Sequence, residues 1–425
     1  MKKYYFLGIG GVSMSALAVM LKHRGFEVGG YDEFSGKGTE ILNKEGIDVD
    51  YILNEGKILQ ADEICYSSAI KQDNPLFVFA KENGKKMSSR GKILGQIASG
   101  YEKVIAVAGS HGKTTTTAMI YQILMCAGKN PTLHLGGYKL DDGLNFHLGD
   151  EEFFVTEACE YHDNFLFLRP YISVVTNIEK EHLDYFKTFQ NQLKSFEKFK
   201  EQSEFIIDGM NELSAKNIRH DKFGRLRFGL YEKDKKIFDL NLNICEDVNT
   251  QNCIYAYQVA KKLGIDDCLI KLGLESYMGV STRFEKVCCP FFDAVVCDYA
   301  HHPTEISKAI RSAKKIYKNR EIITIFQPHT YSRTKLLLDD FVKTFQEVEE
   351  PLFFRTYSAR EKPEDGLSAL QLTEILQKTN KNAKYFENFE DLKTFLLQKQ
   401  KNKVMLLFVG AGDLPEILHK NNFIS

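Results

Sequence analysis

The sequence predicts an α/β fold of three domains built on mostly parallel sheets. At a prior of about 150 residues per domain, 425 residues correspond to about three domains. Short apolar segments alternate with amphipathic ones, which indicates βαβ units. This alternation restarts twice, and each beginning leads from a strand directly into polar or glycine-rich residues. Because open α/β sheets bind ligands beyond the carboxyl ends of their strands, all three beginnings are candidate sites.

The expected elements follow from these apolar segments. The first domain is predicted to contain a helix at 13–23 and strands at Lys3–Leu7, Glu27–Tyr31 and Glu63–Tyr66. The second begins with a strand at Lys103–Ala108, a glycine turn and a helix at 114–126. The third contains strands at 291–297, Glu321–Phe326, 351–355 and Val404–Val409. We therefore expect three Rossmann-like or P-loop-like domains at 1–98, 99–282 and 283–425.

Composition excludes several classes of protein. The 56 Lys and Arg residues nearly cancel the 57 Asp and Glu residues, so bulk charge offers no affinity for nucleic acid. The longest apolar runs, at 16–21 and Val404–Val409, are far shorter than the ~20 residues that span a bilayer. The nine cysteines form no CxxC pair, which argues against a disulfide framework or a zinc site. We expect a cytoplasmic protein without membrane insertion or nucleic-acid partner, acting as a monomer or weak homodimer.

The strongest single motif is a phosphate-binding turn, Ala108-Gly109-Ser110-His111-Gly112-Lys113-Thr114-Thr115, placed between a strand and a helix. Backbone N–H groups in such a turn bind phosphate, and the following helix adds positive potential. Lys113 can reach the β- and γ-phosphates, and Thr114 can bind Mg²⁺. Val107 stands where the full Walker spacing places glycine. A chance glycine-lysine-threonine sequence in a loop is the alternative, and the strand-turn-helix context favours ATP.

A second glycine-rich turn, GIGGVS at 8–13, follows the first strand. Asp32 ends the second strand, where dinucleotide-binding folds place an acidic residue. Ser13 occupies the position of the third glycine of that fingerprint. The turn is therefore consistent with NAD, with another nucleotide diphosphate, or with a tight βα turn that binds nothing. Together with the ATP turn, it suggests two nucleotide-type ligands.

Further motifs run along the whole chain in a fixed order. They are GIGGVSMS at 8–15, SSAI at 67–70 with NP at 74–75, the turn at 109–115, EACEY at 157–161 with FL at 165–166, TNIE at 176–179 with HLD at 182–184, RFE at 283–285, DYAHHPTE at 298–305, FQPH at 326–329 with RT at 333–334, and GAGD at 410–413. This series resembles the Mur ligase family, and within it the branch that joins L-alanine to UDP-N-acetylmuramate.

The resemblance implies a fold and a reaction. It implies a UDP-sugar-binding Rossmann-like domain, a central ATPase domain, and a second Rossmann-like domain that closes over the amino acid and ATP. The lactoyl carboxylate of UDP-N-acetylmuramate would attack the γ-phosphate of ATP to give an acyl phosphate and ADP. The amine of L-alanine would then displace phosphate, and Mg²⁺ would assist by neutralising charge.

The resemblance also implies the roles of individual residues. ATP would be bound by Gly109, Ser110, His111, Gly112, Lys113, Thr114, Thr115, Asn249, Asn252 and Asp298. The metal ligands would be Thr114, Glu157 and His182, and the catalytic residues Lys113, Glu157, His182 and Arg283. Substrates would contact Gly10, Gly11, Ser13, Met14, Asp32, Ser67, Ser68, His301, His302 and Arg333.

Each of the acidic, basic and histidine positions also has a structural interpretation. Glu157 could be a solvated carboxylate at a strand end, and His182 a histidine with a purely structural role. His301 and His302 could cap a helix, and Arg333 could form an exposed ion pair.

Four departures from the family pattern bear on these assignments. Ser13 replaces a glycine, Val248 replaces the histidine that precedes the asparagine pair, and Thr330 stands where many relatives carry arginine. The stretch 230–248 is also short, so we expect a central sheet reduced at one edge, with either lower stability or a compensating contact. Three alternatives remain: a ligase that attaches a tripeptide to the same UDP-sugar, a catalytically silent homologue, and an NAD-dependent dehydrogenase, which leaves 109–115 unexplained.

Overall fold

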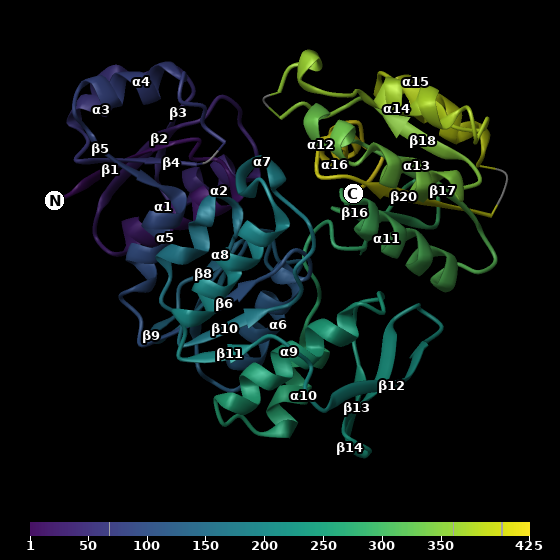
Figure 1. The fold of residues 1–425 in the computed structure, drawn as a ribbon, viewed down its shortest axis with the longest axis horizontal. Helices are drawn as coiled ribbons and strands as arrows, with labels where there is room; N and C mark the ends of the chain where they lie inside the picture. Colours follow the sequence, from purple (N-terminus) through teal and green to yellow (C-terminus); the bar gives the residue numbers. More distant parts are fainter. Residues whose placement is uncertain (68, 360, 401–402) are drawn as a thin grey trace. The chain divides into compact units, whose positions relative to one another are not determined.

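A computed structural model describes residues 1–67, 69–359, 361–400 and 403–425. The chain forms two compact units (Figure 1). The larger unit comprises Met1–Ile218, Arg227–Ile244 and Val248–Val280. The C-terminal unit comprises Ser281–Ser425 with two short segments, Arg219–Leu226 and Cys245–Asp247. The larger unit contains both of the first two expected domains, and the domain limits at 98 and 282 stay predictions.

The N-terminal part of the larger unit is a five-stranded parallel sheet in the order β3-β2-β1-β4-β5. Its strands are β1 (Lys3–Leu7), β2 (Glu27–Tyr31), β3 (Asp48–Asp50), β4 (Glu63–Tyr66) and β5 (Lys86–Ser89). Its helices are α1 (Val12–His23), α2 (Lys37–Lys44), α3 (Glu55–Gln60), α4 (Pro75–Glu82) and α5 (Arg90–Ala98).

Both faces of this sheet are covered, as a doubly wound fold requires. Along β1, Tyr4 and Phe6 pack into the apolar cluster that includes helices α1 and α5. The alternate residues Tyr5 and Leu7 pack into a second cluster on the other face with Ile58 and other residues of α3 and α4. The predicted Rossmann-like arrangement is confirmed here, because a strand buried on both sides needs helices on both faces.

The central part of the larger unit is a six-stranded sheet in the order β11-β10-β6-β9-β7-β8, parallel except for β8. Its strands are β6 (Lys103–Ala108), β7 (Pro131–His134), β8 (Phe146–His147), β9 (Asp150–Glu157), β10 (Ile172–Val175) and β11 (Phe205–Ile207). Its helices are α6 (Lys113–Cys126), η1 (Tyr161–Phe167), α7 (Leu183–Phe186), α8 (Phe189–Glu201), α9 (Asn249–Lys262) and α10 (Asp267–Ser276).

The shortened stretch lies in a separate sheet. Strands β12 (Leu213–His220), β13 (Leu226–Glu232) and β14 (Lys235–Asn241) form a sheet of their own (Figure 1). Residues 230–248 contribute no strand to the six-stranded sheet, and the expectation of a reduced edge on that sheet stays a prediction. Helix α10 packs against β14, and the backbone N–H of Asn241 donates to the Glu275 carboxylate at 2.9 Å. This is a compensating contact of the kind that an exposed strand edge needs.

The C-terminal unit contains a six-stranded sheet in the order β15-β16-β20-β17-β18-β19, with only β15 antiparallel. Its strands are β15 (Glu285–Lys286), β16 (Val295–Asp298), β17 (Glu321–Phe326), β18 (Pro351–Phe354), β19 (Lys384–Phe386) and β20 (Val404–Val409). Its helices are α11 (Pro303–Ile316), α12 (Tyr331–Leu336), α13 (Leu338–Gln346), η2 (Pro363–Asp365), α14 (Ala369–Leu376), α15 (Phe389–Gln398) and α16 (Leu414–Lys420). Alternate residues of β20 pack into two clusters, one on each face.

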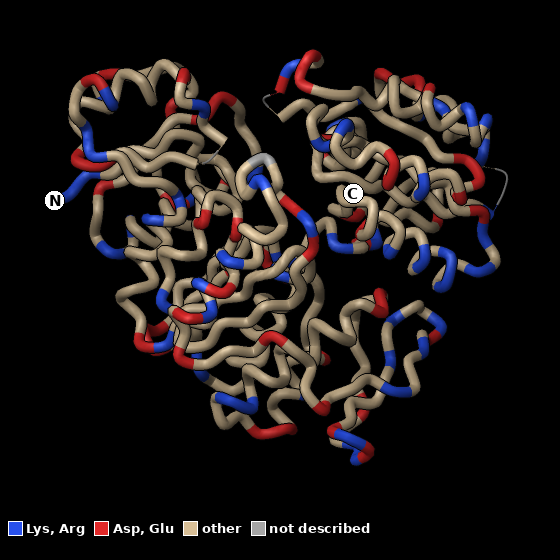
Figure 2. The backbone as a smooth tube through the Cα atoms, in the orientation of Figure 1, with Lys and Arg blue, Asp and Glu red and all other residues tan. Residues whose placement is uncertain are grey.

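Most predicted elements agree with the structure to within a residue. The strand predicted at 291–297 is wrong over its first half, because β16 begins only at Val295. Phe291 and Phe292 are instead in ring contact with Phe423, so their apolar character reflects core packing outside a strand. Lysines and arginines alternate with acidic residues along both units (Figure 2), in line with the near-zero net charge. Within the described residues, no helix has the length and apolar character that crossing a membrane demands.

Candidate active site

The turn between β6 and α6 has the backbone of a phosphate-binding loop. Gly109 and Gly112 have φ values of 129° and 84°, which residues other than glycine rarely adopt. A Cβ atom at Gly109 would also collide with Thr176 Oγ1. The turn then leads into α6, whose first residue is Lys113. The N–H groups at this helix start suit an anion, as the sequence predicted.

The TNIE segment after β10 holds this turn in place. The N–H of Ser110 donates to Asn177 O at 3.0 Å, and the N–H of His111 donates to Asn177 Oδ1 at 3.0 Å. In return, Asn177 Nδ2 and Thr176 Oγ1 both donate to His111 O, at 2.9 and 2.6 Å. The sequence identified this motif only through the family resemblance. The structure shows its physical role, which is to fix the conformation of the phosphate-binding turn.

Lys113 lies at the centre of the site in a strongly acidic environment. Its Nζ donates to the carbonyl groups of Gly109 and Ser110, and it lies 3.3 Å from the fully buried Glu160 carboxylate. Burial alone would lower the pKa of Lys113, but Glu160, Glu181 and Glu157 raise it above its ordinary value. The side chain is therefore a permanent cation at neutral pH. The sequence predicted the lysine, but it assigned no role to Glu160.

Thr114 and Glu157 are brought together, as the predicted metal site requires. The Thr114 hydroxyl donates to Glu157 Oε2 at 3.0 Å, and the N–H of Gly136 donates to Glu157 Oε1 at 2.5 Å. Glu157 is the last residue of β9, next to β6 in the sheet. A hydroxyl and a carboxylate oxygen are the hard ligands that Mg²⁺ prefers, so this pair fits the ion chemically.

His182 lies with a different set of carboxylates from the one predicted. Its Nε2 is 3.9 Å from Glu160 and 3.9 Å from Glu181, and the ligand atoms of these three residues lie within 4.8 Å of one another. The ring also stacks obliquely on Tyr161 at 4.5 Å between centroids. His182 has a positive φ of 55°, a strained backbone for a non-glycine residue. An imidazole with two carboxylates is a second donor set that fits a divalent cation.

The asparagine pair at the start of α9 borders the same turn. Asn252 Nδ2 donates to Asn249 Oδ1 at 2.9 Å, and Thr116 Oγ1 donates to Asn252 Oδ1 at 3.3 Å. A Cβ atom at Gly112 would lie 2.6 Å from Asn252 Oδ1. Val248 precedes the helix without a capping side-chain bond. The structure therefore places Asn249 and Asn252 beside the phosphate-binding turn, as expected of groups that bind the nucleotide. Ser110, Thr114 and Thr115, predicted to bind ATP, are buried in or next to this turn.

The N-terminal glycine turn is also held by its predicted partner. The N–H of Gly10 donates to the Asp32 carboxylate at 2.8 Å, so Asp32 shapes the turn. Gly11 is exposed, and Ser67 lies just beyond β4. The prediction that Met14 contacts the substrate is wrong for its side chain, which is buried in the core on the inner face of α1. Ser68, also predicted to bind substrate, lies outside the described residues.

In the C-terminal unit, Asp298 ties two loops together. Its carboxylate accepts backbone N–H bonds from Phe284 and Ala300, both at 2.7 Å. Burial raises the pKa of Asp298 to about 6, opposed by the charge of Arg283 and by these N–H bonds. The bond to Phe284 fixes the loop of Arg283, whose guanidinium lies 4.7 Å from the centre of the Tyr299 ring. The two residues flanking Arg283 have positive φ values of 58° and 48°, so this tight loop needs such a clamp.

The two histidines after β16 form hydrogen bonds within their own loop and the start of α11. His302 caps α11 by accepting from the N–H of Thr304 at 3.4 Å, and Glu305 accepts from the N–H groups of both histidines. The helix-capping interpretation is thus confirmed for His302. His301 Nδ1 lies 3.0 Å from Tyr299 O. Burial lowers the pKa of His301 to about 3, so its imidazole is neutral.

Arg333 and the FQPH motif lie at the same edge of this sheet. Arg333 donates to His329 Nδ1 at 3.2 Å, and the His329 ring is 6.2 Å from that of His301. The exposed ion pair considered for Arg333 is absent among the described residues. Buried Gln327 donates to Asp413 at 2.7 Å and accepts from the N–H of Leu414. The FQPH and GAGD motifs therefore join the carboxyl ends of β17 and β20.

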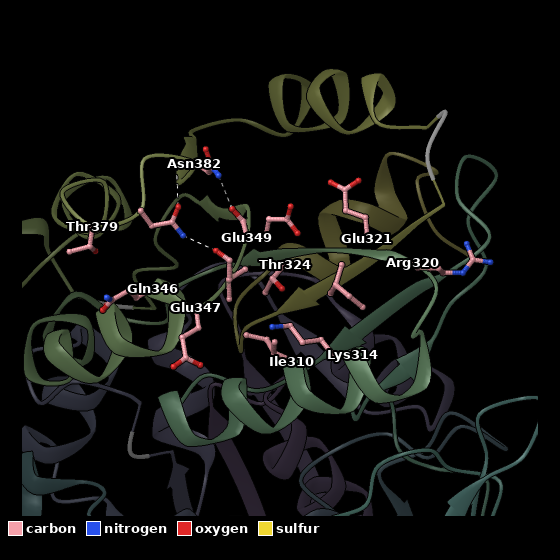
Figure 3. A pocket seen from close by; sticks show the side chains of 13 residues that line it. Ile310, Lys314, Arg320, Glu321, Thr324, Gln346, Glu347, Glu349, Thr379 and Asn382 are labelled. Atoms are coloured by element: carbon pink, nitrogen blue, oxygen red, sulfur yellow. Dashed lines mark hydrogen bonds between the residues drawn. The ribbon is translucent and has the colours of Figure 1, made fainter.

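A separate cavity of this unit lies at the opposite edge of its sheet. It has a volume of about 540 Å³, and Figure 3 shows Ile310 and Lys314 of α11 beside Thr324 and Glu321 of β17. Its lining includes the amino end of β17, whereas ligands of parallel sheets bind beyond the carboxyl ends. It contains none of the predicted site residues.

Comparisons with known proteins agree with this arrangement. Three family models match in order: "Mur ligase family, catalytic domain" at 3–102, "Mur ligase middle domain" at 107–261, and "Mur ligase, glutamate ligase domain" at 282–412. The UDP-N-acetylmuramate–L-alanine ligase of Caldicellulosiruptor bescii is 37% identical, covering 98% of each chain. The enzyme of that name from Clostridium botulinum is 36% identical over 98% of this chain and 96% of its own.

Solved structures show the same fold. The UDP-N-acetylmuramate–alanine ligase of Thermotoga maritima superimposes with a TM-score of 0.85 at 24% identity, covering 99% of this chain and 98% of that one. A murein peptide ligase from Psychrobacter arcticus gives a TM-score of 0.72 at 21% identity, with the same coverage. The full-length identity to the curated relatives, together with three consecutive family models, shows that this chain belongs to the Mur ligase family.

Proposed function

We propose that this chain is an ATP-dependent ligase that joins L-alanine to the lactoyl carboxylate of UDP-N-acetylmuramate in peptidoglycan precursor synthesis. One observation carries the proposal. The chain has a preformed phosphate-binding turn with Lys113, and the Thr114–Glu157 pair lies beside it, in a sequence that matches L-alanine ligases over its whole length. The ACEY motif, shared in the resemblance with the branch that uses free alanine, favours alanine over a tripeptide.

The reaction joins two anions, so the protein must neutralise charge and align the reactants. A lactoyl carboxylate oxygen forms a bond to the γ-phosphorus while the bond to the β–γ bridging oxygen breaks, giving an acyl phosphate and ADP. Lys113 and the N–H groups of the turn hold the phosphates. The amine of L-alanine then bonds to the acyl carbon, loses a proton and displaces inorganic phosphate. Arg283, whose loop is held by Asp298, would supply a second cation for the phosphates.

We further propose that Mg²⁺ assists the transfer at the two donor sets described above. Thr114 and Glu157 would hold one ion, and His182 with Glu160 and Glu181 would hold a second. When bound, such ions shield the phosphate charge and polarise the γ-phosphoryl group. Asn249 and Asn252 would contact the adenine, and Asp298 the ribose. Gly10, Gly11, Ser13, Asp32 and Ser67 would form the UDP-sugar site, and His301, His302 and Arg333 would face the carboxylate of the sugar or the alanine.

The decisive experiment is phosphate release from ATP with UDP-N-acetylmuramate and one acceptor at a time. L-Alanine, glycine, L-serine and the tripeptide are compared, each with and without Mg²⁺. We expect release with L-alanine and its loss when the metal is chelated. Release with the tripeptide alone would identify the recycling ligase, and no release with any acceptor would identify a silent homologue. We expect a cytoplasmic monomer or weak homodimer, to be tested by fractionation and sedimentation.

A further inference from the structure

Arg90, to which the preceding sections assign no role, begins helix α5 beside the N-terminal glycine turn. Its Nη1 donates to Ser13 Oγ at 3.2 Å. Among the residues that the structure describes, this is the one hydrogen bond of the guanidinium, and no carboxylate forms an ion pair with it. A guanidinium has five N–H donors in a rigid plane. The remaining donors are available to an anionic ligand.

Ser13 belongs to a short chain of hydrogen bonds that runs through His134 to Thr156. Ser13 Oγ lies 2.8 Å from His134 Nε2, and His134 Nδ1 lies 2.8 Å from Thr156 Oγ1. The Thr156 hydroxyl donates its one proton to Glu157 O at 3.0 Å. In the tautomer that keeps this bond, Nδ1–H donates to Thr156 and Nε2 accepts from Ser13. His134 is 1% exposed, and burial lowers its pKa to about 3, so the ring is neutral and makes both bonds.

This order decides what Ser13 can do. In that tautomer the Ser13 proton is donated to His134, and Ser13 has none to offer a ligand phosphate. Its oxygen instead accepts from Arg90 and anchors the guanidinium at the start of α1. The serine that stands where the family pattern places glycine therefore has a role, which is to position Arg90.

The surroundings of Arg90 point to an anion. The N–H groups of the glycine turn and the start of the 12-residue helix α1 provide positive potential on one side. The central acidic motif lies on another, since the charge of Arg90 opposes the burial that raises the pKa of Cys159. A cation between a nucleotide-diphosphate turn and the phosphate-transfer site is placed to meet the anionic part of the UDP-sugar.

We infer that Arg90 binds the UDP-sugar by donating to an anionic oxygen, of the diphosphate or of the lactoyl carboxylate, and that His134 positions Arg90 through Ser13. The inference rests on the proposed function for the identity of the ligand. It assigns Ser13 an indirect role, in place of the direct substrate contact predicted from the sequence.

The test measures binding and turnover for Arg90→Ala and Arg90→Lys. We expect Arg90→Ala to raise both the Kd and the KM for UDP-N-acetylmuramate at least about 10-fold, as for the loss of a hydrogen bond to a charged group. The KM for ATP should change by less than about 2-fold. Arg90→Lys should recover part of the affinity, because an ammonium keeps the charge but loses the planar geometry.

Arg24→Ala is the matched control. Arg24 lies at the other end of the same pair of helices, where it donates to Ile97 O of α5 at 2.8 Å. The substitution removes an arginine between α1 and α5 that does not contact the glycine turn, so the affinity for UDP-sugar should stay unchanged.

Binding of UDP alone separates the two sources of the anion. If Arg90→Ala weakens UDP and UDP-N-acetylmuramate alike, Arg90 contacts the diphosphate; if it weakens only the latter, Arg90 contacts the lactoyl carboxylate. Unchanged affinity for both in the folded variant overturns the inference. The proposed function fails separately, if the unmodified protein releases no phosphate.

The positioning role of His134 has its own readout. His134→Gln should raise the KM for UDP-sugar about 3- to 10-fold with kcat retained, and should add nothing further in the Arg90→Ala background. Should His134→Gln fail to fold, Ser13→Ala removes the same anchor at the surface of the turn. An additive effect of either variant on Arg90→Ala would contradict the positioning role.

Discussion

The phosphate-binding region of the larger unit and the carboxyl edge of the sheet in the C-terminal unit are built on the same kind of parallel sheet, but their polar side chains are engaged differently. Around Lys113, polar and charged side chains bond to one another at the phosphate-binding turn. Thr114 donates to Glu157, and Lys113 pairs with Glu160. In the C-terminal unit, Asp298 and His302 bond mainly to backbone groups of their own loops. The side chains of the first region are arranged to bind a charged ligand. Those of the second region fix the conformation of their own loops.

This difference predicts how each region responds to substitution. Changes at the phosphate-binding turn should lower turnover with little effect on the rest of the fold. Changes at the C-terminal edge should lower stability first and turnover through the displaced loops. The following predictions would sharpen or break that contrast.

The largest effect is expected for Lys113→Ala. Removing a preorganised cation from the transferring phosphate should lower kcat at least about 100- to 1,000-fold. The affinity for UDP-sugar should be kept, because that ligand binds at the other glycine turn. Calorimetric binding and phosphate release measure the two quantities. Thr114→Val is the control for the effect of leaving the buried Glu160 carboxylate without Lys113, because it changes the same turn and keeps that pair. Loss of UDP-sugar binding in folded Lys113→Ala would contradict two separate sites.

Asp298→Asn should act mainly on stability. The amide keeps one acceptor but turns an NH₂ group toward a backbone N–H, which costs about 1–3 kcal/mol of unfolding free energy. The Arg283 loop then loses its clamp, and kcat should fall about 10-fold. Denaturant unfolding and turnover report both effects. Asp293→Asn is the control, since Asp293 is an exposed aspartate of the same unit in an ion pair with Arg320; an equal loss in both variants would refute the clamp.

Acidification should destabilise both units. Burial lowers the pKa of His134 to about 3 in the larger unit, and of His301 and His329 to about 3 and 4 in the other. Below pH 6.5 the unfolded chain binds these protons and the native chain does not, so unfolding free energy falls as pH falls. Each histidine contributes at most about 1.4 kcal/mol per pH unit.

Asp298 opposes this trend in the C-terminal unit. Burial raises its pKa to about 6, so between pH 6 and 4 the native state binds a proton that the unfolded state does not. Asp298→Asn should therefore steepen the fall between pH 6 and 4. Unfolding curves at pH 7, 6, 5 and 4 provide the measurement, and a slope unaffected by the variant would exclude the assigned direction.

The smallest effect is expected at Thr330. This residue has φ and ψ of 68° and 146°, a conformation that costs a β-branched residue of order 1–3 kcal/mol. Thr330→Gly should relieve the strain and raise unfolding free energy by about 1 kcal/mol, after the entropy that glycine adds to the unfolded chain. Thr330→Ala keeps the Cβ atom and should give no gain. Urea midpoints distinguish the two.

Much of the fold could be predicted because buried parallel strands are short, continuous apolar runs. Strands such as Lys103–Ala108 and Val404–Val409 are apolar on both faces, so their limits are visible in the sequence. The strand predicted at 291–297 failed because Phe291 and Phe292 are buried by aromatic packing outside the sheet. Apolar character reports burial, and burial alone does not distinguish a strand from a packed loop.

The candidate site was predictable where a motif is local in sequence. Gly109, Lys113 and Thr114 belong to one turn, so their spacing identifies them. Glu160, Glu181 and Arg90 have no such local signal, because each acquires its role from groups far away along the chain.

By itself, the sequence determined the three sheet-forming segments, the two glycine turns and the cation that meets phosphate, since these depend on neighbours within a few residues. Only the tertiary structure decided that Glu160 faces Lys113, that Asp298 holds the Arg283 loop, and that Ser13 lies between Arg90 and His134. Hydrogen bonds and ion pairs depend on distance and direction to within a fraction of an ångström. For groups separated by dozens of residues, packing of the sheets and helices sets that geometry.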